Sequence, residues 1–361
     1  MNILFVISEM YRGGAEKMVA NLAEYFAVKK KSHVCIAVFN NDNSAYQLYE
    51  GIKYIKLNCS SSDLKMRIPV VDKIRKVIKE EKIDVIIGFS IGISELLPFA
   101  VIGTRCRAIG SERSNPYLKQ LTSVRKSILN HILERLDGMI FTTTGCRDYY
   151  SKKIRDKSTV IPNGFVPKEG FSFEPTLKHR HDSRNIIAIG NLREVKDYPT
   201  MLKAFKLFSD KHDDYTLNIY GEGIEEKAIL SLISELDLEG KAFIHGSVSN
   251  LEGIYLDSCF MVHSSKSESW CNAILEALSF GVPCIAADCD FGPREMIKHG
   301  FNGFLVKIGD YEKMAFFMNE LANDQKQLAL MSENAYKDAK KFEFENIADK
   351  YYSYAIGSMK A

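Results

Sequence analysis

The sequence lacks most of the patterns that by themselves indicate a function. Its eight cysteines form no Cys-x2-Cys pair, and several lie inside apolar runs, so we expect reduced core residues rather than a disulfide framework or a zinc site. No helix-turn-helix, zinc-finger or RNA-recognition pattern is present, and nucleic acid is therefore not an expected partner. No cluster of histidines in the sequence compels a bound metal.

Long apolar runs are also scarce. The longest, from Val85 to Gly103, is interrupted by Glu95, Pro98 and three glycines, so it predicts a strand followed by a helix rather than a membrane span. The segment from Met1 to Glu9 has no basic leader and too short an apolar core for a signal peptide. We therefore expect it to form the first strand of a cytoplasmic protein.

The composition is that of a globular protein with room for two domains. The chain has 361 residues, of which 46% are hydrophobic and 26% are charged. Residues 1–166 carry 26 lysines and arginines against 16 acidic residues, a net charge of +10, whereas the whole chain carries only +2. A basic first half predicts attraction to an anionic partner, either the headgroups of the inner membrane leaflet or a diphosphate-linked acceptor.

Short apolar segments alternate with helical patterns along both halves, which predicts an α/β protein with doubly wound sheets. The turn signal Ile161-Pro-Asn-Gly-Phe165, followed by Pro167, Gly170 and Pro175, predicts a domain boundary near residue 166. We expect strands at residues 3–7, 33–39, 53–57, 84–88, 107–110, 139–143 and 159–161, and then at 186–189, 217–220, 243–245, 260–263, 284–286 and 303–306.

The stretch from Ser267 to Pro283 is the most informative part of the chain. It predicts a polar loop after a strand, then a short helix whose start favours an anion such as a nucleotide diphosphate. Glu268 and Glu276 lie eight positions apart, so they can contact two parts of one ligand, and a carboxylate suits the two hydroxyls of a sugar diol. For an arbitrary pair at this spacing, two solvated glutamates would be the ordinary interpretation.

Two further loops have residues suited to a phosphorylated ligand. Gly13 and Gly14 separate the first strand from a helix and allow a ligand to approach the backbone, although such glycines are commonly plain connections. Arg193 and Lys196 lie between a strand and a helix in the second half, where two cations can bracket a diphosphate. The alternative for Lys196 is a solvent-facing lysine.

Glu112 and Arg113 follow another predicted strand and can bind sugar hydroxyls or phosphate. A local ion pair that caps a turn explains Arg113 equally well, whereas we favour a functional role for Glu112. The helix expected over residues 118–136 is either a core helix, which we favour, or a membrane-facing acceptor helix. We interpret His245 and His263, each alone at a strand end, as satisfied core groups.

The stretch from Ser267 to Glu295 resembles the E-x7-E signature of retaining glycosyltransferases with the GT-B architecture, family 4, and especially the subgroup that builds bacterial surface polysaccharides such as capsule. The resemblance implies that Glu276 holds the ribose hydroxyls of a nucleotide. It also implies that Glu268 holds the transferred sugar, together with backbone N–H groups at Asn272 and Ala273. Ser269-Trp270 stands where many relatives have Gly-Phe.

Other loops are similar to the same family. The segment from Gly190 to Lys196 resembles its G-R-L-x-x-x-K pattern, with Lys196 as the conserved lysine. Asn191 replaces the arginine of the pattern, and we expect Arg193 to supply the positive charge instead. Gly13 and Gly14 resemble the N-terminal loop that faces the donor phosphate and the acceptor. Glu112 occupies a place where relatives use a polar residue to contact the donor hexose. The resemblance also implies that the turn at Val248 supplies backbone bonds to the nucleotide base.

The resemblance implies the GT-B fold, with two Rossmann-like domains facing a cleft: an acceptor domain over 1–166, a nucleotide-sugar domain over 167–343, and a last helix over about 344–361 that packs back on the first domain. The implied activity is transfer of a hexose or N-acetylhexosamine, with retention, from a UDP-linked sugar to a glycan or a polyprenyl-diphosphate-linked acceptor. No cofactor and no metal are expected. The alternatives are a UDP-sugar epimerase or phosphorylase on the same fold, and a non-catalytic sugar-binding subunit.

Overall fold

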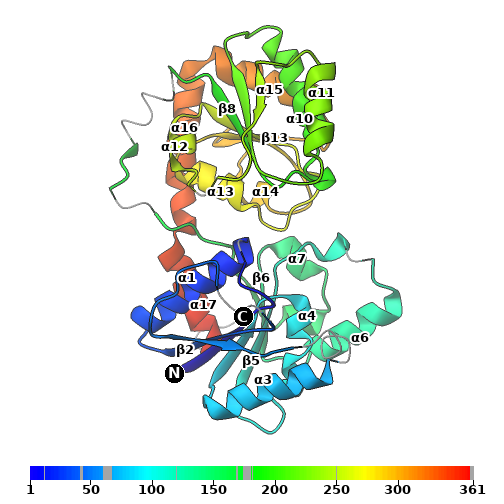
Figure 1. The fold of residues 1–361 in the computed structure, drawn as a ribbon, viewed down its shortest axis with the longest axis vertical. Coiled ribbons are helices and arrows are strands. Elements are labelled where there is room, and N and C mark those ends of the chain that lie inside the picture. Colours follow the sequence, from blue (N-terminus) through cyan, green and yellow to red (C-terminus); the bar gives the residue numbers. More distant parts are fainter. Residues whose placement is uncertain are drawn as a thin grey trace. The chain divides into compact units, whose positions relative to one another are not determined.

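The computed structural model describes residues 1–11, 13–40, 44–59, 67–118, 120–167, 170–173, 180, 182–248 and 250–357. Pro175 of the predicted boundary segment and residues 358–361 of the expected last helix lie outside this set. The chain divides into two compact units, one formed by residues 1–164 together with the helix that begins at Phe344, and the other by residues 165–343. Each unit is a parallel sheet with helices on both faces (Figure 1).

The first unit contains a seven-stranded sheet in the order β3-β2-β1-β4-β5-β6-β7, and all neighbouring strands are parallel. The strands are short and rich in valine and isoleucine, which suits a sheet that is covered on both faces. Their bounds are β1 (Asn2–Val6), β2 (His33–Val38), β3 (Ile52–Lys56), β4 (Val85–Gly88), β5 (Arg107–Glu112), β6 (Gly138–Phe141) and β7 (Ser158–Val160).

Helices of the first unit cover both faces of this sheet (Figure 1). Two of them, α1 and α17, pack on one face with a shared cluster of buried residues that includes Phe5, Phe26 and Tyr351. Their bounds, with those of the other helices, are α1 (Gly14–Val28), α3 (Ile68–Glu80), α4 (Ile91–Ser94), α5 (Leu97–Ala100), η1 (Pro116–Leu118), α6 (Ser123–Leu133), α7 (Thr144–Asp148), α8 (Lys152–Arg155) and α17 (Phe344–Ala355).

Polar contacts as well as apolar ones attach α17 to the sheet. The Tyr354 hydroxyl accepts a hydrogen bond from the Met139 amide at 3.0 Å and donates to the Lys157 carbonyl at 2.5 Å. The Arg113 guanidinium donates to the hydroxyl of Tyr351. Arg113 therefore ties the end of β5 to α17, which is a structural contact beyond the local turn.

The second unit contains a six-stranded parallel sheet in the order β10-β9-β8-β11-β12-β13. Its strands are β8 (Asn185–Ile189), β9 (Thr216–Tyr220), β10 (Ala242–Ile244), β11 (Phe260–His263), β12 (Cys284–Ala287) and β13 (Gly303–Val306). Its helices are η2 (Glu194–Lys196), α10 (Tyr198–Ser209), α11 (Glu226–Glu235), α12 (Glu252–Leu256), α13 (Asn272–Ser279), α14 (Pro293–Met296), α15 (Tyr311–Asn323), α16 (Gln325–Ala339) and η3 (Lys340–Phe342).

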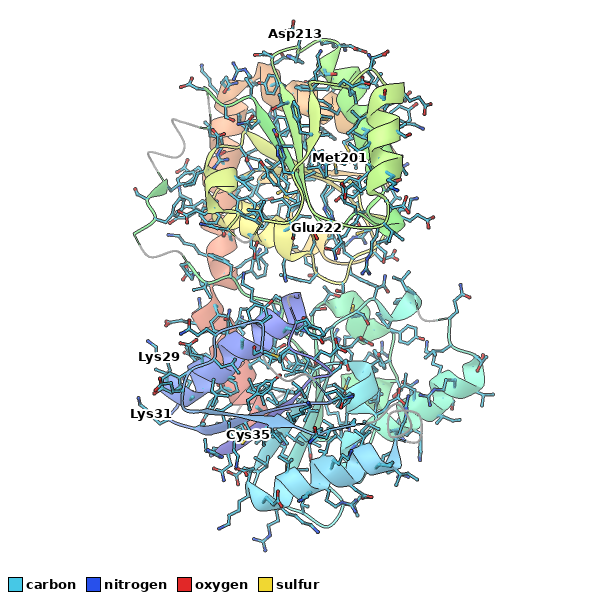
Figure 2. All side chains as sticks on the ribbon, in the orientation of Figure 1. Lys29, Lys31, Cys35, Met201, Asp213 and Glu222 are labelled. Atoms are coloured by element: carbon cyan, nitrogen blue, oxygen red, sulfur yellow. The ribbon has the colours of Figure 1, made fainter. Side chains whose placement is uncertain are left out.

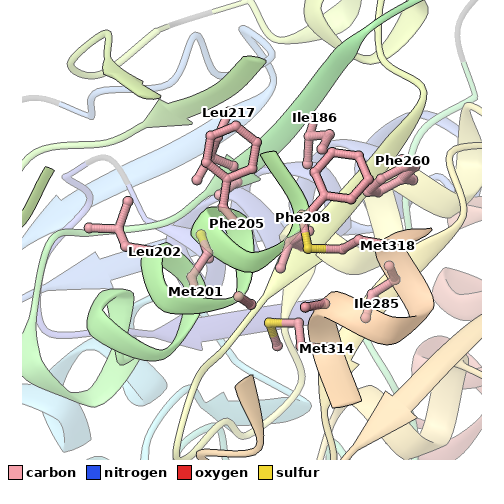
Figure 3. Close-up of a cluster of buried hydrophobic side chains, with 14 of the residues drawn as sticks. Ile186, Met201, Leu202, Phe205, Phe208, Leu217, Phe260, Ile285, Met314 and Met318 are labelled. Carbon is pink, nitrogen blue, oxygen red and sulfur yellow. The ribbon is translucent and has the colours of Figure 1, made fainter. Parts of the chain in front are cut away.

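Two apolar clusters hold the second unit together, one on each face of the sheet. On one face, Phe205 and Phe208 of α10 pack with Phe260 of β11 and with Met314 and Met318 of α15 (Figure 3). On the other face, buried residues of α12, α13 and α16 pack against β11 and β12. The central strands are thus fixed on both sides, so the loops at their ends start from rigid positions.

The strands expected from the sequence are confirmed, with ends that shift by at most two residues. The segment from Val85 to Gly103 forms β4, α4 and α5, as expected, and no helix among the described residues is long and apolar enough to cross a membrane. All eight cysteines are buried and free.

The helix expected over residues 118–136 is wrong in length, and the core environment that we favoured for it holds on one side only. It is the shorter α6, which starts where Thr122 accepts a hydrogen bond from the amide of Arg125. Leu129 and Leu133 of α6 are buried, as expected for a core helix. Val124 and Ile128, however, are 70% and 47% exposed, so the other side of the helix is not part of the core.

Candidate active site

The sheet of the second unit has a point at which the direction of strand addition reverses. β9 and β10 extend it to one side of β8, and β11, β12 and β13 extend it to the other, so β8 and β11 are neighbours that are distant in sequence. Open α/β sheets bind ligands outside the carboxyl ends of the strands at such a point. Loops 190–197 and 264–271 leave the carboxyl ends of these two strands.

Hydrogen bonds hold these two loops together. The Ser264 hydroxyl donates to the Lys196 carbonyl at 2.7 Å, and the Ser265 hydroxyl donates to the Val195 carbonyl at 3.1 Å. The Lys266 amide donates to the same Val195 carbonyl at 2.8 Å. The backbone at Lys196 is therefore fixed beside the loop that carries Glu268.

The side chains of Lys196, His263 and Glu268 meet between these loops. Lys196 Nζ lies 2.6 Å from Glu268 Oε1, and His263 Nε2 lies 2.9 Å from the same oxygen. Their side chains are 19%, 5% and 12% exposed. Cys271 Sγ is 3.5 Å from His263 Nε2. One carboxylate oxygen thus lies between two nitrogen donors in a nearly closed environment.

The cluster holds its groups in their charged forms. Burial alone would raise the pKa of Glu268, but hydrogen bonds and positive charge from His263 and Lys196 outweigh it and lower that pKa to about 2. Burial alone would lower the pKa of His263, but Cys271 and Glu268 outweigh it and raise it to about 9. The pKa of Lys196 is raised, because the charge of Glu268 outweighs burial.

The helix α13 begins directly after this cluster. Asn272 and Ala273 form its first two positions and are half-buried, and the amides of a first helical turn have no partner within the helix. Cys271, just before it, has a φ of 73°, a left-handed conformation that is uncommon for a residue with a side chain and concentrates at functional sites. Further along α13, Glu276 accepts a hydrogen bond from the Tyr255 hydroxyl at 3.3 Å.

Two turns that follow β9 and β10 complete the same edge. A Cβ on Gly221 would lie 2.0 Å from the Gly190 carbonyl oxygen, and one on Gly223 would lie 2.2 Å from the Leu192 carbonyl oxygen, so only glycine fits against the first loop. Between them, the carboxylate of Glu222, labelled in Figure 2, accepts a hydrogen bond from the Ser247 amide at 3.2 Å. Val248 follows this amide and is 38% exposed.

Arg193 is not part of the cluster. Its side chain is exposed and lines, with Lys266 and Tyr198, a separate cavity of about 90 Å³ beside α10 and α11. The Lys196 amide donates a backbone hydrogen bond to the Arg193 carbonyl at 2.9 Å, but within the described residues no hydrogen bond or ion pair of the Arg193 side chain reaches Lys196 or Glu268. Its predicted compensation for the missing arginine therefore stays a prediction.

The predicted glycines of the first unit lie at the carboxyl end of β1. The Gly13 amide donates to the Tyr46 hydroxyl at 2.9 Å, and that hydroxyl donates back to the Gly13 carbonyl at 2.8 Å. Gly14 is the first residue of α1. A Cβ on Gly13 would lie 2.2 Å from the carboxylate of Glu16, so the backbone here is closely surrounded by its own chain.

Glu112 lies at the end of β5 and is only 1% exposed. One carboxylate oxygen accepts from the amides of Arg113 and Ser114, both at 3.1 Å, and from the Ser114 hydroxyl at 2.7 Å. The other oxygen accepts from the Tyr150 hydroxyl at 2.9 Å. In this state Glu112 organises its own loop, and its contact with a donor sugar stays a prediction.

The sequence interpretation missed the part played by His263. It was expected to be a satisfied core histidine; it is buried, but its partner is Glu268 rather than the core. The available signal was its position, at the end of the strand that precedes Glu268 by five residues. Cys271 gave no signal, because its contact with His263 depends on the turn before α13.

Comparisons with known proteins bear on the identity of this site. The family model described as Glycosyltransferase Family 4 matches residues 12–169, and the one described as Glycosyl transferases group 1 matches residues 172–338. The chain belongs to the family 4 glycosyltransferases. This glycosyltransferase is 22% identical, over 96% of its length and 97% of the relative, to an uncharacterized glycosyltransferase of Haemophilus influenzae.

A second relative has a more specific name. The glycosyltransferase is 26% identical, over 97% of each chain, to the Campylobacter jejuni GalNAc-alpha-(1->4)-GalNAc-alpha-(1->3)-diNAcBac-PP-undecaprenol alpha-1,4-N-acetyl-D-galactosaminyltransferase.

Solved structures establish the fold. Anabaena HepE in complex with UDP superposes with a TM-score of 0.83 at 19% identity, over 99% of this chain and all of that one. Sucrose-phosphate synthase from Thermosynechococcus elongatus gives the same TM-score at 16% identity, over 99% and 100% of the two chains. The glycosyltransferase has the α/β GT-B fold that these structures share.

Proposed function

We propose that this glycosyltransferase moves a hexose or N-acetylhexosamine from a UDP-linked sugar, with retention of anomeric configuration, to a glycan or polyprenyl-diphosphate-linked acceptor in bacterial surface polysaccharide synthesis. The observation that carries the proposal is the Lys196–Glu268–His263 cluster at the start of α13, where β8 and β11 meet. It places a carboxylate, a buried ammonium and helix amides at the edge where α/β sheets bind nucleotides.

The charges of the cluster suit departure of a diphosphate. As the bond from the sugar C1 to the diphosphate breaks and the acceptor oxygen bonds to C1, negative charge grows on the leaving oxygen, which takes the acceptor proton. Lys196 and the first-turn amides of α13 stabilise that charge, with Arg193 as the additional cation. The incoming diphosphate competes with Glu268 for Lys196, and Glu268 is then available to sugar hydroxyls. In this proposal no metal is needed for the transfer.

Relatives support the finer details. A solved structural neighbour is Anabaena HepE with UDP-glucose, which supports UDP as the nucleotide. Two relatives from Campylobacter jejuni are named as N-acetylgalactosaminyltransferases acting on undecaprenol-linked sugars, and a third relative is the amylovoran biosynthesis glycosyltransferase AmsD of Erwinia amylovora. These names favour a lipid-linked acceptor and a surface polysaccharide.

The test is product analysis with UDP-, GDP- and TDP-sugars, each with and without a polyprenyl-diphosphate-linked glycan. We expect UDP release that needs the acceptor, and a product whose anomeric configuration matches that of the donor in NMR spectra. Conversion of the sugar without acceptor would instead indicate an epimerase. Release of a sugar phosphate would indicate a phosphorylase, and binding without any turnover would indicate a sugar-binding subunit.

A groove in the first unit supports contact with an anionic membrane surface. It encloses about 820 Å³, and its lining includes three arginines (Arg67, Arg75 and Arg125), two carboxylates (Asp72 and Glu95) and the exposed residues Ile68 and Ile102. Glu95 forms ion pairs with Arg67 and Arg125. The two isoleucines are 67% and 61% exposed. Three arginines against two carboxylates leave the groove with a net positive charge, which, beside exposed apolar side chains, suits lipid phosphates and the boundary with their acyl chains.

Vesicle co-sedimentation tests this contact. We expect the wild-type chain to bind vesicles that contain phosphatidylglycerol, and the Ile68→Asp/Ile102→Asp variant to bind them at least about tenfold more weakly. Lys31→Glu, a charge change at an exposed position of the same unit, is the control and should bind within about threefold of wild type. Equal binding by the isoleucine variant and wild type would show that this groove is not the contact.

A further inference from the structure

Three side chains with metal-binding atoms meet at the edge of the first sheet that is opposite to the ligand-binding ends of its strands. His33 is the first residue of β2, and Cys35 follows two positions later on the same face of that strand. Glu81 caps the end of α3, close to the start of β4. The fold therefore brings Glu81 next to a His-x-Cys pair, although Glu81 and Cys35 are 46 residues apart in the chain.

The separations of the three atoms resemble the edges of a tetrahedral zinc site. His33 Nε2 lies 3.3 Å from Glu81 Oε2 and 3.5 Å from Cys35 Sγ, and Cys35 Sγ lies 4.0 Å from Glu81 Oε2. Zinc bonds of about 2.0 Å to nitrogen or oxygen and about 2.3 Å to sulfur give separations of roughly 3.3 to 3.6 Å at tetrahedral angles. Only the sulfur–carboxylate edge has to shorten, by about half an ångström.

The surroundings of the cluster suit an ion. Lys53, beside Cys35 on β3, donates to the other carboxylate oxygen of Glu81 at 2.6 Å, so it orients the carboxylate with Oε2 toward His33 and Cys35. The His33 side chain is 43% exposed and gives access from solvent, whereas Cys35, labelled in Figure 2, is buried.

We propose that His33, Cys35 and Glu81 bind one zinc ion, with water as the fourth ligand. Zinc forms a bond to the Cys35 sulfur, whose proton leaves to solvent, and no electron is transferred. The ion joins the start of β2 to the end of α3 in the first unit. It has no part in sugar transfer, and the site is separate from the cluster of Lys196, His263 and Glu268 in the second unit.

A second set of suitable residues, His263, Glu268 and Cys271, is less suited to an ion. Lys196 Nζ lies 2.6 Å from the Glu268 oxygen that faces His263, so a cation there would meet a buried ammonium on the same oxygen. At the first cluster the lysine contacts the opposite carboxylate oxygen. We therefore expect substitution of Cys35 to weaken zinc binding and substitution of Cys271 to leave it unchanged.

The experiment is a Zn²⁺ titration of the full chain after a chelator has removed bound metal, with a colorimetric zinc chelator as the competitor. A parallel titration with Co²⁺ detects thiolate ligation by its absorption. We expect one zinc per chain, and a higher melting temperature at saturating zinc, because zinc binds only the folded site. Cys35→Ser and His33→Ala should each weaken zinc binding by at least about tenfold. The His33 side chain is 43% exposed, whereas Cys35 is buried, so the His33 variant tests the site even if Cys35→Ser fails to fold.

Two controls separate this site from other thiols. Cys106→Ser removes another buried thiol of the first unit and should leave zinc binding unchanged. Cys271→Ser removes the thiol of the second cluster and should also leave it unchanged. Loss of binding in Cys271→Ser with normal binding in His33→Ala would overturn the proposal. So would the absence of cobalt–thiolate absorption in the wild-type chain.

Discussion

Glu268 is the residue on which the chemistry that we propose for the second unit depends. Both Lys196 Nζ and His263 Nε2 lie within 2.9 Å of its Oε1 atom. Removing one partner of a buried pair leaves the other charge poorly compensated, so substitutions here act on stability as well as on turnover. The two effects separate when activity and unfolding are measured on the same variants.

Lys196→Ala should lower kcat about 100- to 1000-fold and change KM for the donor much less, because Lys196 stabilises charge that grows as the diphosphate leaves. Steady-state kinetics with the active UDP-sugar measure both constants. Lys203→Ala, at an exposed lysine of α10, is the matched control and should keep the wild-type kcat. A Lys196→Ala enzyme as fast as this control would refute the assignment.

His263 should give the second unit a distinct dependence of stability on pH. Its pKa is about 9 in the folded chain against an ordinary 6.5, so its stabilisation is complete below pH 6.5 and is lost as the pH rises through 9. Relative to His263→Gln, wild type should lose about 2 to 3 kcal/mol of unfolding free energy over that range. Glu268 and Cys271 contact the ring and set this window, and Lys196 contacts the same Glu268 oxygen.

Denaturant titrations at a series of pH values measure this difference. His212→Gln, which alters a histidine bonded to Asn319 away from the cluster, should keep the wild-type pH dependence. If His263→Gln and wild type changed in parallel across the window, His263 would not be protonated beside Glu268.

At the scale of elements, the site is an edge where four loops converge after β8, β9, β10 and β11. The sequence predicted these strands because each is a short apolar run bounded by polar or glycine-rich segments, a local property. It also predicted that Lys196 and Glu268 belong to one site, through the family resemblance. The strand order that makes β8 and β11 neighbours, and so lets the two residues touch, is a property of the whole sheet.

Residues that meet only through the fold were not predictable in this way. The metal-binding group of His33, Cys35 and Glu81 has no motif spacing, and the cysteines therefore predicted no zinc site. The exposure of Val124 and Ile128 was missed although their pattern along the sequence was clear. Helical periodicity identifies an apolar stripe, but it does not say whether another element covers that stripe.

Gly223→Ala should destabilise the edge of the site, because the new Cβ would lie 2.2 Å from the Leu192 carbonyl oxygen and the backbone there has to shift. We expect a loss of about 2 kcal/mol or more in unfolding free energy, together with weaker donor binding. Gly253→Ala in α12 is the control, since nothing lies within 4 Å of its Cβ. It should be neutral or stabilising by up to about 1 kcal/mol. Calorimetric unfolding that ranks both variants equally would contradict this account.

At the scale of the whole molecule, the two units divide the charge as well as the chain. The residues up to 166 carry a net charge of +10 although the chain carries only +2, so the remainder is acidic. The first unit has the arginine-lined groove, and the second has the cluster of Lys196, His263 and Glu268. This division supports an acceptor and membrane role for the first unit and a nucleotide role for the second.

The measurement that tests the central claim most directly is calorimetric titration of UDP into the full chain and into its Glu276→Ala variant. We predict that wild type binds UDP and that Glu276→Ala binds it about 10- to 100-fold more weakly, because the carboxylate loses its bonds to the ribose hydroxyls. Glu235→Ala, at an exposed glutamate of α11, should bind as wild type does. Equal UDP affinity in all three proteins would contradict a nucleotide site at α13.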